Sequence, residues 1–172
     1  MQRSIFAMLA AIALGLFFAG IAQAQVVAFG ASNVSGYGVN ATEAFPAQLE
    51  GLLRQKGFNV AVRNAGVYGN TTTQMLNRLD QDVPPDTKVV IIDMSGGYFN
   101  NAFQGLSRQQ GDEDMRMIGA KLRARGIKII PENSRDLPPS DRQADRVHLN
   151  PEGHRIVAAR LLPLVMRALG HG

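Results

Sequence analysis

Four short apolar runs, each ended by a polar or glycine-rich stretch, divide the chain after residue 25. Residues 26–29 are uniformly apolar, residues 59–63 alternate and include β-branched side chains, and two further runs cover 88–94 and 127–130. Short continuous apolar runs are typical of strands that are buried on both faces of a parallel sheet. The pattern therefore predicts four parallel strands.

Segments with helical periodicity separate and follow these runs. Helices are predicted over residues 42–56, 71–79, 112–125 and 150–169, from the spacing of apolar side chains and from capping residues at their ends. Alternation of strands and helices predicts an α/β fold, with a parallel sheet covered by helices on both faces. Four strands are clear, whereas a fifth is short or absent because residues 131–144 are polar and contain prolines.

The first 24 residues follow a different pattern. A basic start at residues 1–4 leads into an apolar run over 5–21, and Ala22-Gln23-Ala24 has the small-x-small form of a signal-peptidase site. The run is at the lower length limit for a membrane span, and an uncleaved anchor is the alternative. We predict a signal peptide over 1–24, export to the periplasm or medium, and one mature domain over 25–172 with no stable membrane insertion.

Composition excludes several classes of function. The chain has no cysteine, so it can form neither a disulfide nor a thiolate nucleophile. The net charge of +4 is not gathered into a stripe, and only 6% of the residues are aromatic, so no nucleic-acid partner is expected. Neither an H-x-x-x-H nor an H-E-x-x-H pair occurs, so no metal or other cofactor is predicted. The oligomeric state is left open.

Ligands of open α/β sheets bind beyond the carboxyl ends of the strands. The loops at those ends cover residues 30–40, 64–70, 95–101 and 131–148. The first loop contains Ser32 but matches neither the dinucleotide, nor the Walker, nor the G-x-S-x-G glycine pattern. By itself this serine is either a nucleophile or an ordinary helix cap.

The last loop contains Asp145 and His148 immediately before the final helix. Two intervening residues allow the carboxylate to fold back onto the imidazole, fix its tautomer and stabilise its protonated form, as a catalytic triad requires. An ordinary surface Asp–His pair is the alternative. Gly66, after the second strand, can present a bare N–H to a reacting oxygen or form a tight turn. His154 lies inside the last helix and is predicted to be structural.

Four ordered blocks resemble the SGNH, or GDSL-type, hydrolase family. They are Gly30-Ala31-Ser32, Asn64-Ala65-Gly66, Gly96-Gly97-Tyr98-Phe99 and Asp145-Arg146-Val147-His148, beside the family motifs G-D-S, N-x-G-x-x-G, G-x-N-D and D-x-x-H. The resemblance covers residues 26–169 and extends to the branch of small arylesterases and acyl-CoA-thioesterase-like enzymes. It implies a three-layer, flavodoxin-like fold and a hydrolase of small acyl esters or thioesters, aryl esters, acyl-CoA or lysophospholipids among them.

The resemblance also implies roles for individual residues. Ser32 would be the nucleophile, His148 the base and Asp145 the residue that orients it, and the N–H groups of Ser32 and Gly66 would form two arms of the oxyanion hole. Tyr98 stands where the family has its oxyanion-hole asparagine. A tyrosine hydroxyl can donate a hydrogen bond but reaches farther.

Three departures from the family pattern keep other functions open. The oxyanion-hole asparagine is missing, and Asn100 or Asn101 would replace it only on a shifted backbone. Ala31 replaces an aspartate that is not a member of the triad. The segment before Asp145, residues 131–144, is shorter than the helix and strand that the family usually has there. One alternative is a non-catalytic protein of the cell envelope that binds a ligand in the same fold. The other is a carbohydrate O-deacetylase, which the few aromatic side chains in the loops disfavour.

Overall fold

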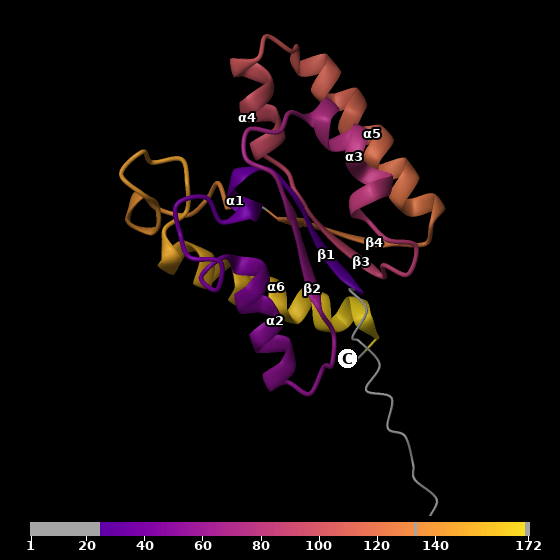
Figure 1. Ribbon diagram of the computed structural model, residues 1–172, viewed down its shortest axis with the longest axis vertical. Helices are drawn as coiled ribbons and strands as arrows, with labels where there is room; N and C mark the ends of the chain where they lie inside the picture. The colour runs from indigo at the N-terminus through magenta and orange to yellow at the C-terminus, as the bar shows by residue number, and fades with distance from the viewer. Residues whose placement is uncertain (1–24, 133, 171–172) are drawn as a thin grey trace, which may run out of the picture.

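One sheet of four parallel strands, in the order β2-β1-β3-β4, forms the centre of the computed structural model (Figure 1). The structure describes residues 25–132 and 134–170, so the predicted signal peptide lies outside the described residues. The strands are β1 (Val26–Gly30), β2 (Val62–Gly66), β3 (Val89–Asp93) and β4 (Lys128–Glu132). The predicted α/β class and its four parallel strands are confirmed.

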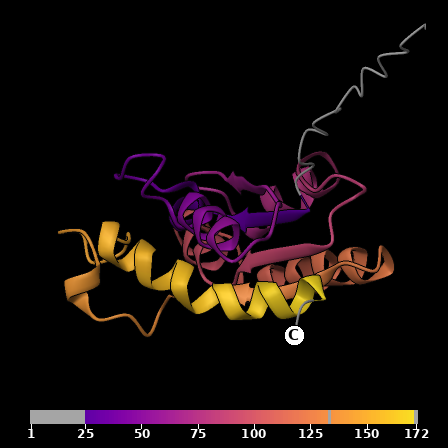
Figure 2. The same ribbon diagram turned by 90° about the horizontal axis from the view of Figure 1, so that it is seen from below.

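Helices cover both faces of the sheet, which gives the three predicted layers (Figures 1 and 2). One face is covered by α2 (Phe45–Gln55) and α6 (Pro151–Leu169), and the other by α3 (Thr72–Asp82) and α5 (Arg108–Ala124). Two shorter helices, α1 (Ser32–Ser35) and α4 (Gly96–Phe103), follow β1 and β3 at their carboxyl ends. Within the described ranges, no helix has both the length and the apolarity needed to cross a bilayer.

The alternating side chains of β1 explain its unbroken apolar sequence. Val26 and Ala28 belong to the core under α2 and α6, whereas Val27 and Phe29 belong to the core under α3 and α5. All four side chains are fully buried. A strand between two helical layers has no solvent-facing side, so every position is apolar.

Several predicted boundaries are wrong, among them the start of the helix predicted over 112–125, which begins at Arg108, and the end of the helix predicted over 71–79, which extends to Asp82. The second strand was expected over 59–63 but begins at Val62, because it is an edge strand that tolerates exposed polar residues. The helix expected from residue 42 begins at Phe45, since the chain before it forms a turn in which Glu43 accepts the Asn40 N–H. The loop expected after β3 is the helix α4.

The connection from β4 to α6 contains no fifth strand in its described part. It has only the 3₁₀ turn η1 (Pro139–Asp141) and an isolated bridge between Arg142 and Leu149. Arg142 holds the connection together by donating to the carbonyl oxygens of Val147 and Ser134. The Leu149 N–H donates to the Asn33 side chain at 3.0 Å, which fixes this connection beside α1.

His154 is fully buried in α6 and has the structural role predicted from the sequence. Its Nδ1 accepts the backbone N–H of Phe45 at 3.2 Å and so holds the first turn of α2 against α6. Burial lowers the pKa of His154 to about 4. The imidazole therefore stays neutral in the folded protein at pH values where the unfolded chain binds a proton.

We expect His154 to make the folded state less stable as the pH falls from about 6.5 to 4. In that window the unfolded state takes up a proton that the folded state does not, which costs up to about 3 kcal/mol of unfolding free energy. Urea denaturation at pH 7 and pH 4.5 measures the effect. His154→Gln removes the titrating group, so the stability of the variant at pH 4.5 relative to pH 7 should be higher than that of the original chain. An unchanged difference in that variant would contradict the expectation.

Candidate active site

Ser32 lies at the carboxyl end of β1, where the chain turns directly from strand to helix. It is the first residue of α1, and 8% of its surface is exposed. The first N–H groups of a helix have no acceptor within that helix, so the Ser32 N–H is suited to bind an oxygen. One short turn thus brings a candidate nucleophile and a candidate oxyanion donor to the carboxyl edge of the sheet.

Asp93 supports this turn, although the sequence analysis did not identify it as a site residue. It ends β3, is 2% exposed and accepts the Ala31 N–H at 3.3 Å. Its other carboxylate oxygen accepts the N–H groups of Ser95 and Gly96, each at 2.8 Å. Asp93 therefore joins the turns after β1 and β3. The sequence signal that could have identified Asp93 is a carboxylate at the end of a strand that is otherwise wholly apolar.

Asp145 and His148 are brought together as the D-x-x-H spacing predicts. Their closest atoms, Asp145 Oδ2 and His148 Nδ1, are 2.6 Å apart. The other oxygen, Asp145 Oδ1, accepts the N–H groups of Val147 and His148. The hydrogen bonds from the His148 side chain and backbone lower the pKa of Asp145 to about 2. The carboxylate is therefore ionised at neutral pH and can orient the imidazole.

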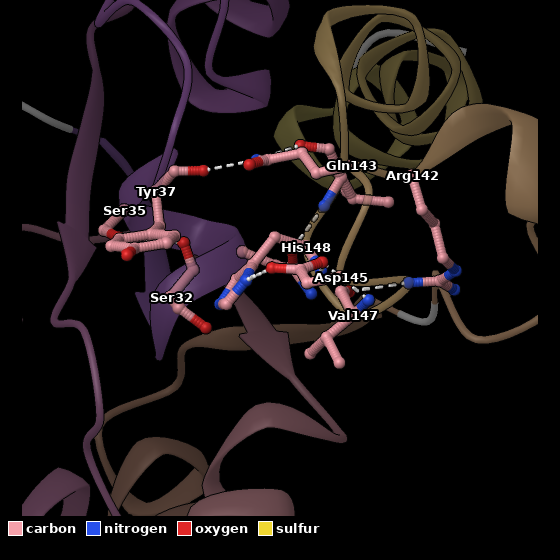
Figure 3. Close-up of polar contacts among 10 residues, drawn as sticks. Ser32, Ser35, Tyr37, Arg142, Gln143, Asp145, Val147 and His148 are labelled. Atoms are coloured by element: carbon pink, nitrogen blue, oxygen red, sulfur yellow. Dashed lines mark hydrogen bonds and ion pairs between the residues drawn. The ribbon is translucent and has the colours of Figure 1, made fainter.

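The His148 ring lies beside the Ser32 side chain (Figure 3). Among the described contacts no hydrogen bond joins the two side chains, which is common in a site without substrate, where such bonds tighten only on binding. The Tyr37 ring packs against the imidazole with 4.5 Å between centroids, and Tyr68 stacks on Tyr37 at the same separation. Gln143 donates to the Tyr37 carbonyl and thereby links this loop to the Asp145–His148 loop.

Gly66 ends β2 and pairs with Gly30 at the end of β1. A Cβ atom at Gly66 would overlap the backbone nitrogen of Ser35, so only glycine permits α1 to pass this close. In the structure the Gly66 N–H donates to Asn64 Oδ1 at 3.0 Å. An oxyanion bound at this position would replace the Asn64 oxygen as acceptor.

The three side chains considered as a further oxyanion donor are engaged elsewhere. The Tyr98 hydroxyl donates to Asp112 on α5 at 2.8 Å, and burial followed by this hydrogen bond raises the pKa of Tyr98 to about 12. Asn100 donates to the Asn70 carbonyl, and Asn101 bonds with the first residue of α3. The chain after β3 is helical from Gly96 on, and this helix directs these side chains toward α3, α5 and the loop before α3.

A cavity of about 620 Å³ opens next to Ser32, on the side of β3 and β4. Met94 and Phe99 are among the apolar side chains on its wall, and four arginines are among the polar ones. Within the described ranges, no group of three or more His, Asp or Glu residues is placed to hold a metal ion.

Sequence comparison matches a family model and a curated esterase. The model of the GDSL-like Lipase/Acylhydrolase family matches residues 28–144, a match that ends just before Asp145. Esterase TesA of Pseudomonas aeruginosa is 24% identical over 119 residues, which are 69% of this chain and 58% of that protein. The chain thus spans a little over half the length of this relative.

Three solved structures have a similar fold. The psychrotrophic esterase EstA from Pseudoalteromonas sp. has a TM-score of 0.72 at 14% identity, covering 85% of this chain and 98% of EstA. The crystal structure of TesA has a TM-score of 0.71 at 18% identity, covering 83% and 98%. The SGNH-hydrolase family esterase AlinE4 has a TM-score of 0.56 at 26% identity, covering 86% and 80%. Since the family model matches well over half of its residues, the chain belongs to the GDSL-like lipase/acylhydrolase family.

Proposed function

We propose that the protein is an exported serine hydrolase that cleaves small acyl ester or thioester bonds through an acyl-enzyme. The observation that carries the proposal is the 2.6 Å contact between Asp145 and His148, formed beside Ser32 at the carboxyl end of β1. The relatives named as esterases support the same reaction class. Export follows from the predicted signal peptide and would place the enzyme in the periplasm or outside the cell.

The reaction begins when Ser32 Oγ attacks the carbonyl carbon and His148 Nε2 takes the hydroxyl proton. The electron pair of the carbonyl bond moves onto its oxygen, which the N–H groups of Ser32 and Gly66 stabilise. Collapse of this intermediate breaks the bond to the alcohol or thiol, which receives the proton from His148. Water then attacks the acyl-enzyme by the same steps, releases the acid and restores Ser32.

Two backbone donors make a weaker oxyanion hole than three. The hydroxyl of Tyr98 and the amide of Asn100 each have another partner, so neither is available to the oxyanion in this arrangement. Loss of one donor typically costs about 10²–10³ in turnover. We therefore propose a slow esterase that retains the complete Ser32, His148 and Asp145 set.

The test combines a covalent probe with turnover. We expect a fluorophosphonate to label Ser32 and 4-nitrophenyl acetate to be hydrolysed, and both to be lost in Ser32→Ala. Ser35→Ala is the matched control, because Ser35 lies in the same short helix and its hydroxyl donates to the Ser32 carbonyl. No labelling of Ser32, together with turnover no higher than in Ser32→Ala, would contradict the proposal and favour the non-catalytic alternative.

A further inference from the structure

The cavity beside Ser32 is strongly cationic. Its lining contains four arginines and no carboxylate. Arg108 comes from the start of α5, and Arg135, Arg142 and Arg146 come from the connection between β4 and α6. This single-sign lining raises the local concentration of anions, because opposite charge attracts them into a confined space.

The arginines differ in how far the protein already uses them. Arg142 donates to two backbone carbonyls and is a structural part of the wall. Arg108 is 3.9 Å from Asp112, and both side chains are more than half exposed, so this ion pair is weak. The described residues supply neither a hydrogen bond nor an ion pair to the Arg146 guanidinium. Arg146 is thus the clearest candidate to bind a ligand.

The backbone of Arg146 is in an uncommon conformation. Its φ of 58° is the only positive value among the described non-glycine residues. The turn is imposed by Asp145, whose Oδ1 accepts the N–H groups of Val147 and His148. Left-handed backbone at a residue other than glycine, asparagine or aspartate is uncommon and costs free energy. The same turn that orients His148 therefore holds a cation at the cavity.

Two carboxylates near the cavity, Asp145 and Glu132, leave the charge of Arg146 uncompensated. Asp145 is engaged by the His148 ring and two backbone N–H groups. Glu132, at the end of β4, is 2% exposed, and burial, followed by the charge of Asp93, raises its pKa to about 8. Glu132 is therefore mostly neutral at pH 7, and the positive charge of the cavity persists there.

We propose that this cavity binds an anionic group of the substrate, a carboxylate or a phosphate, so that Ser32 acts on anionic esters in preference to neutral ones. Guanidinium groups pair with both anions through paired N–H donors. Met94 and Phe99 supply an apolar wall for the carbon chain between the anion and the ester. The inference rests on the proposed function and specifies its substrate class.

Two matched pairs of esters locate the charge on the substrate. In the first pair, mono-4-nitrophenyl glutarate carries a carboxylate on its acyl group, and 4-nitrophenyl pentanoate is its neutral counterpart. In the second pair, 4-acetoxybenzoate carries the carboxylate on its leaving group, and 4-acetoxybenzamide is its neutral counterpart. At low salt we expect kcat/KM to favour the anionic member of at least one pair by about tenfold, and added salt to reduce this preference.

Single variants connect the preference to the cavity. Arg146→Gln and Arg135→Gln should each lower the anionic-to-neutral ratio about threefold or more. Arg146→Lys should retain most of it. Arg116→Gln on α5 is the matched control, since Arg116 is an exposed arginine outside the cavity lining. Ratios at or below one in both pairs, or ratios that neither variant changes, would overturn the proposal.

A binding measurement tests the anion site independently of the proposed esterase activity. If no ester is turned over more than in Ser32→Ala, the proposed hydrolase fails, and equilibrium dialysis of the two 4-nitrophenyl esters with Ser32→Ala decides the anion site. Tighter binding of the glutarate ester, lost when Arg146→Gln is added, supports the site. Equal binding of the two esters overturns it.

Discussion

Replacing His148 with alanine is expected to lower kcat for 4-nitrophenyl acetate by about 10³–10⁴-fold, with a smaller effect on KM. Without the imidazole, the described lining of the cavity beside Ser32 offers no carboxylate or histidine that could accept the Ser32 proton or return one to the leaving group. The remaining activity would come from the backbone donors of Ser32 and Gly66, which the substitution does not touch. Steady-state kinetics of the purified variant gives the result.

Asp145→Asn separates orientation from general-base chemistry. Its side-chain oxygen can still accept the N–H groups of Val147 and His148, so the turn is expected to form. The amide nitrogen would face His148 Nδ1 and favour the wrong tautomer, so we expect a loss of about 10³–10⁴ in kcat. His154→Gln is the control for removal of a histidine outside the site. Activity within tenfold of the original in His148→Ala would refute the triad.

Glu132→Gln is expected to stabilise the folded protein at pH 8. The side chain is 2% exposed, and neither carboxylate oxygen has a hydrogen-bond partner among the described residues. It lies in register with Asp93 on the neighbouring strand. Burial and then the Asp93 charge raise the pKa of Glu132 to about 8. An ionised carboxylate at this position is costly because burial removes its hydration and the charge of Asp93 repels it.

The direction of the pH dependence follows from this raised pKa. Between about pH 4.5 and 8 the folded state keeps a proton that the unfolded state has released. The contribution of Glu132 to stability is therefore greatest below pH 4.5 and falls as the pH rises, by up to about 5 kcal/mol. Glutamine has the same shape and does not titrate, so the variant should gain stability at pH 8 relative to the original chain and differ little from it at pH 4.5.

Urea denaturation of the original chain and of Glu132→Gln at pH 4.5 and pH 8 measures this gain. Glu113→Gln on α5 controls for the loss of a negative charge. The pH range in which Glu132 titrates overlaps that of His154, whose effect on stability has the opposite sign. The free energy of unfolding of the original chain alone would therefore change little with pH. A Glu132→Gln variant that is less stable than the original chain at pH 8 would contradict the expectation.

Local sequence patterns were sufficient to predict an element where the interactions that form it join residues close together in the chain. The last helix begins as predicted, with Asn150 as its cap and Pro151 as its first residue. The Asp145–His148 contact also spans only three residues. Strand β1 was predictable because burial on both faces requires an unbroken apolar run.

The features that local patterns did not predict depend on contacts between residues that are distant in sequence. Glycines 96 and 97 indicate a loop, yet the chain is helical there and the Asp93 carboxylate accepts the Gly96 N–H. The direction of Tyr98 depends on Asp112, which lies on the next helix. The predicted position of β2 failed because an edge strand needs only one buried face.

The sequence by itself determined the α/β class and the order of the elements, and it indicated Ser32, Asp145 and His148 as the candidate catalytic set, because periodicity, capping and the four motif blocks are local. Only the tertiary structure decided that Tyr98 and Asn100 bond to other partners and that four arginines share one cavity. Those arginines come from the start of α5 and from the connection after β4. Their proximity depends on strand order and on the path of that connection, which no local pattern encodes.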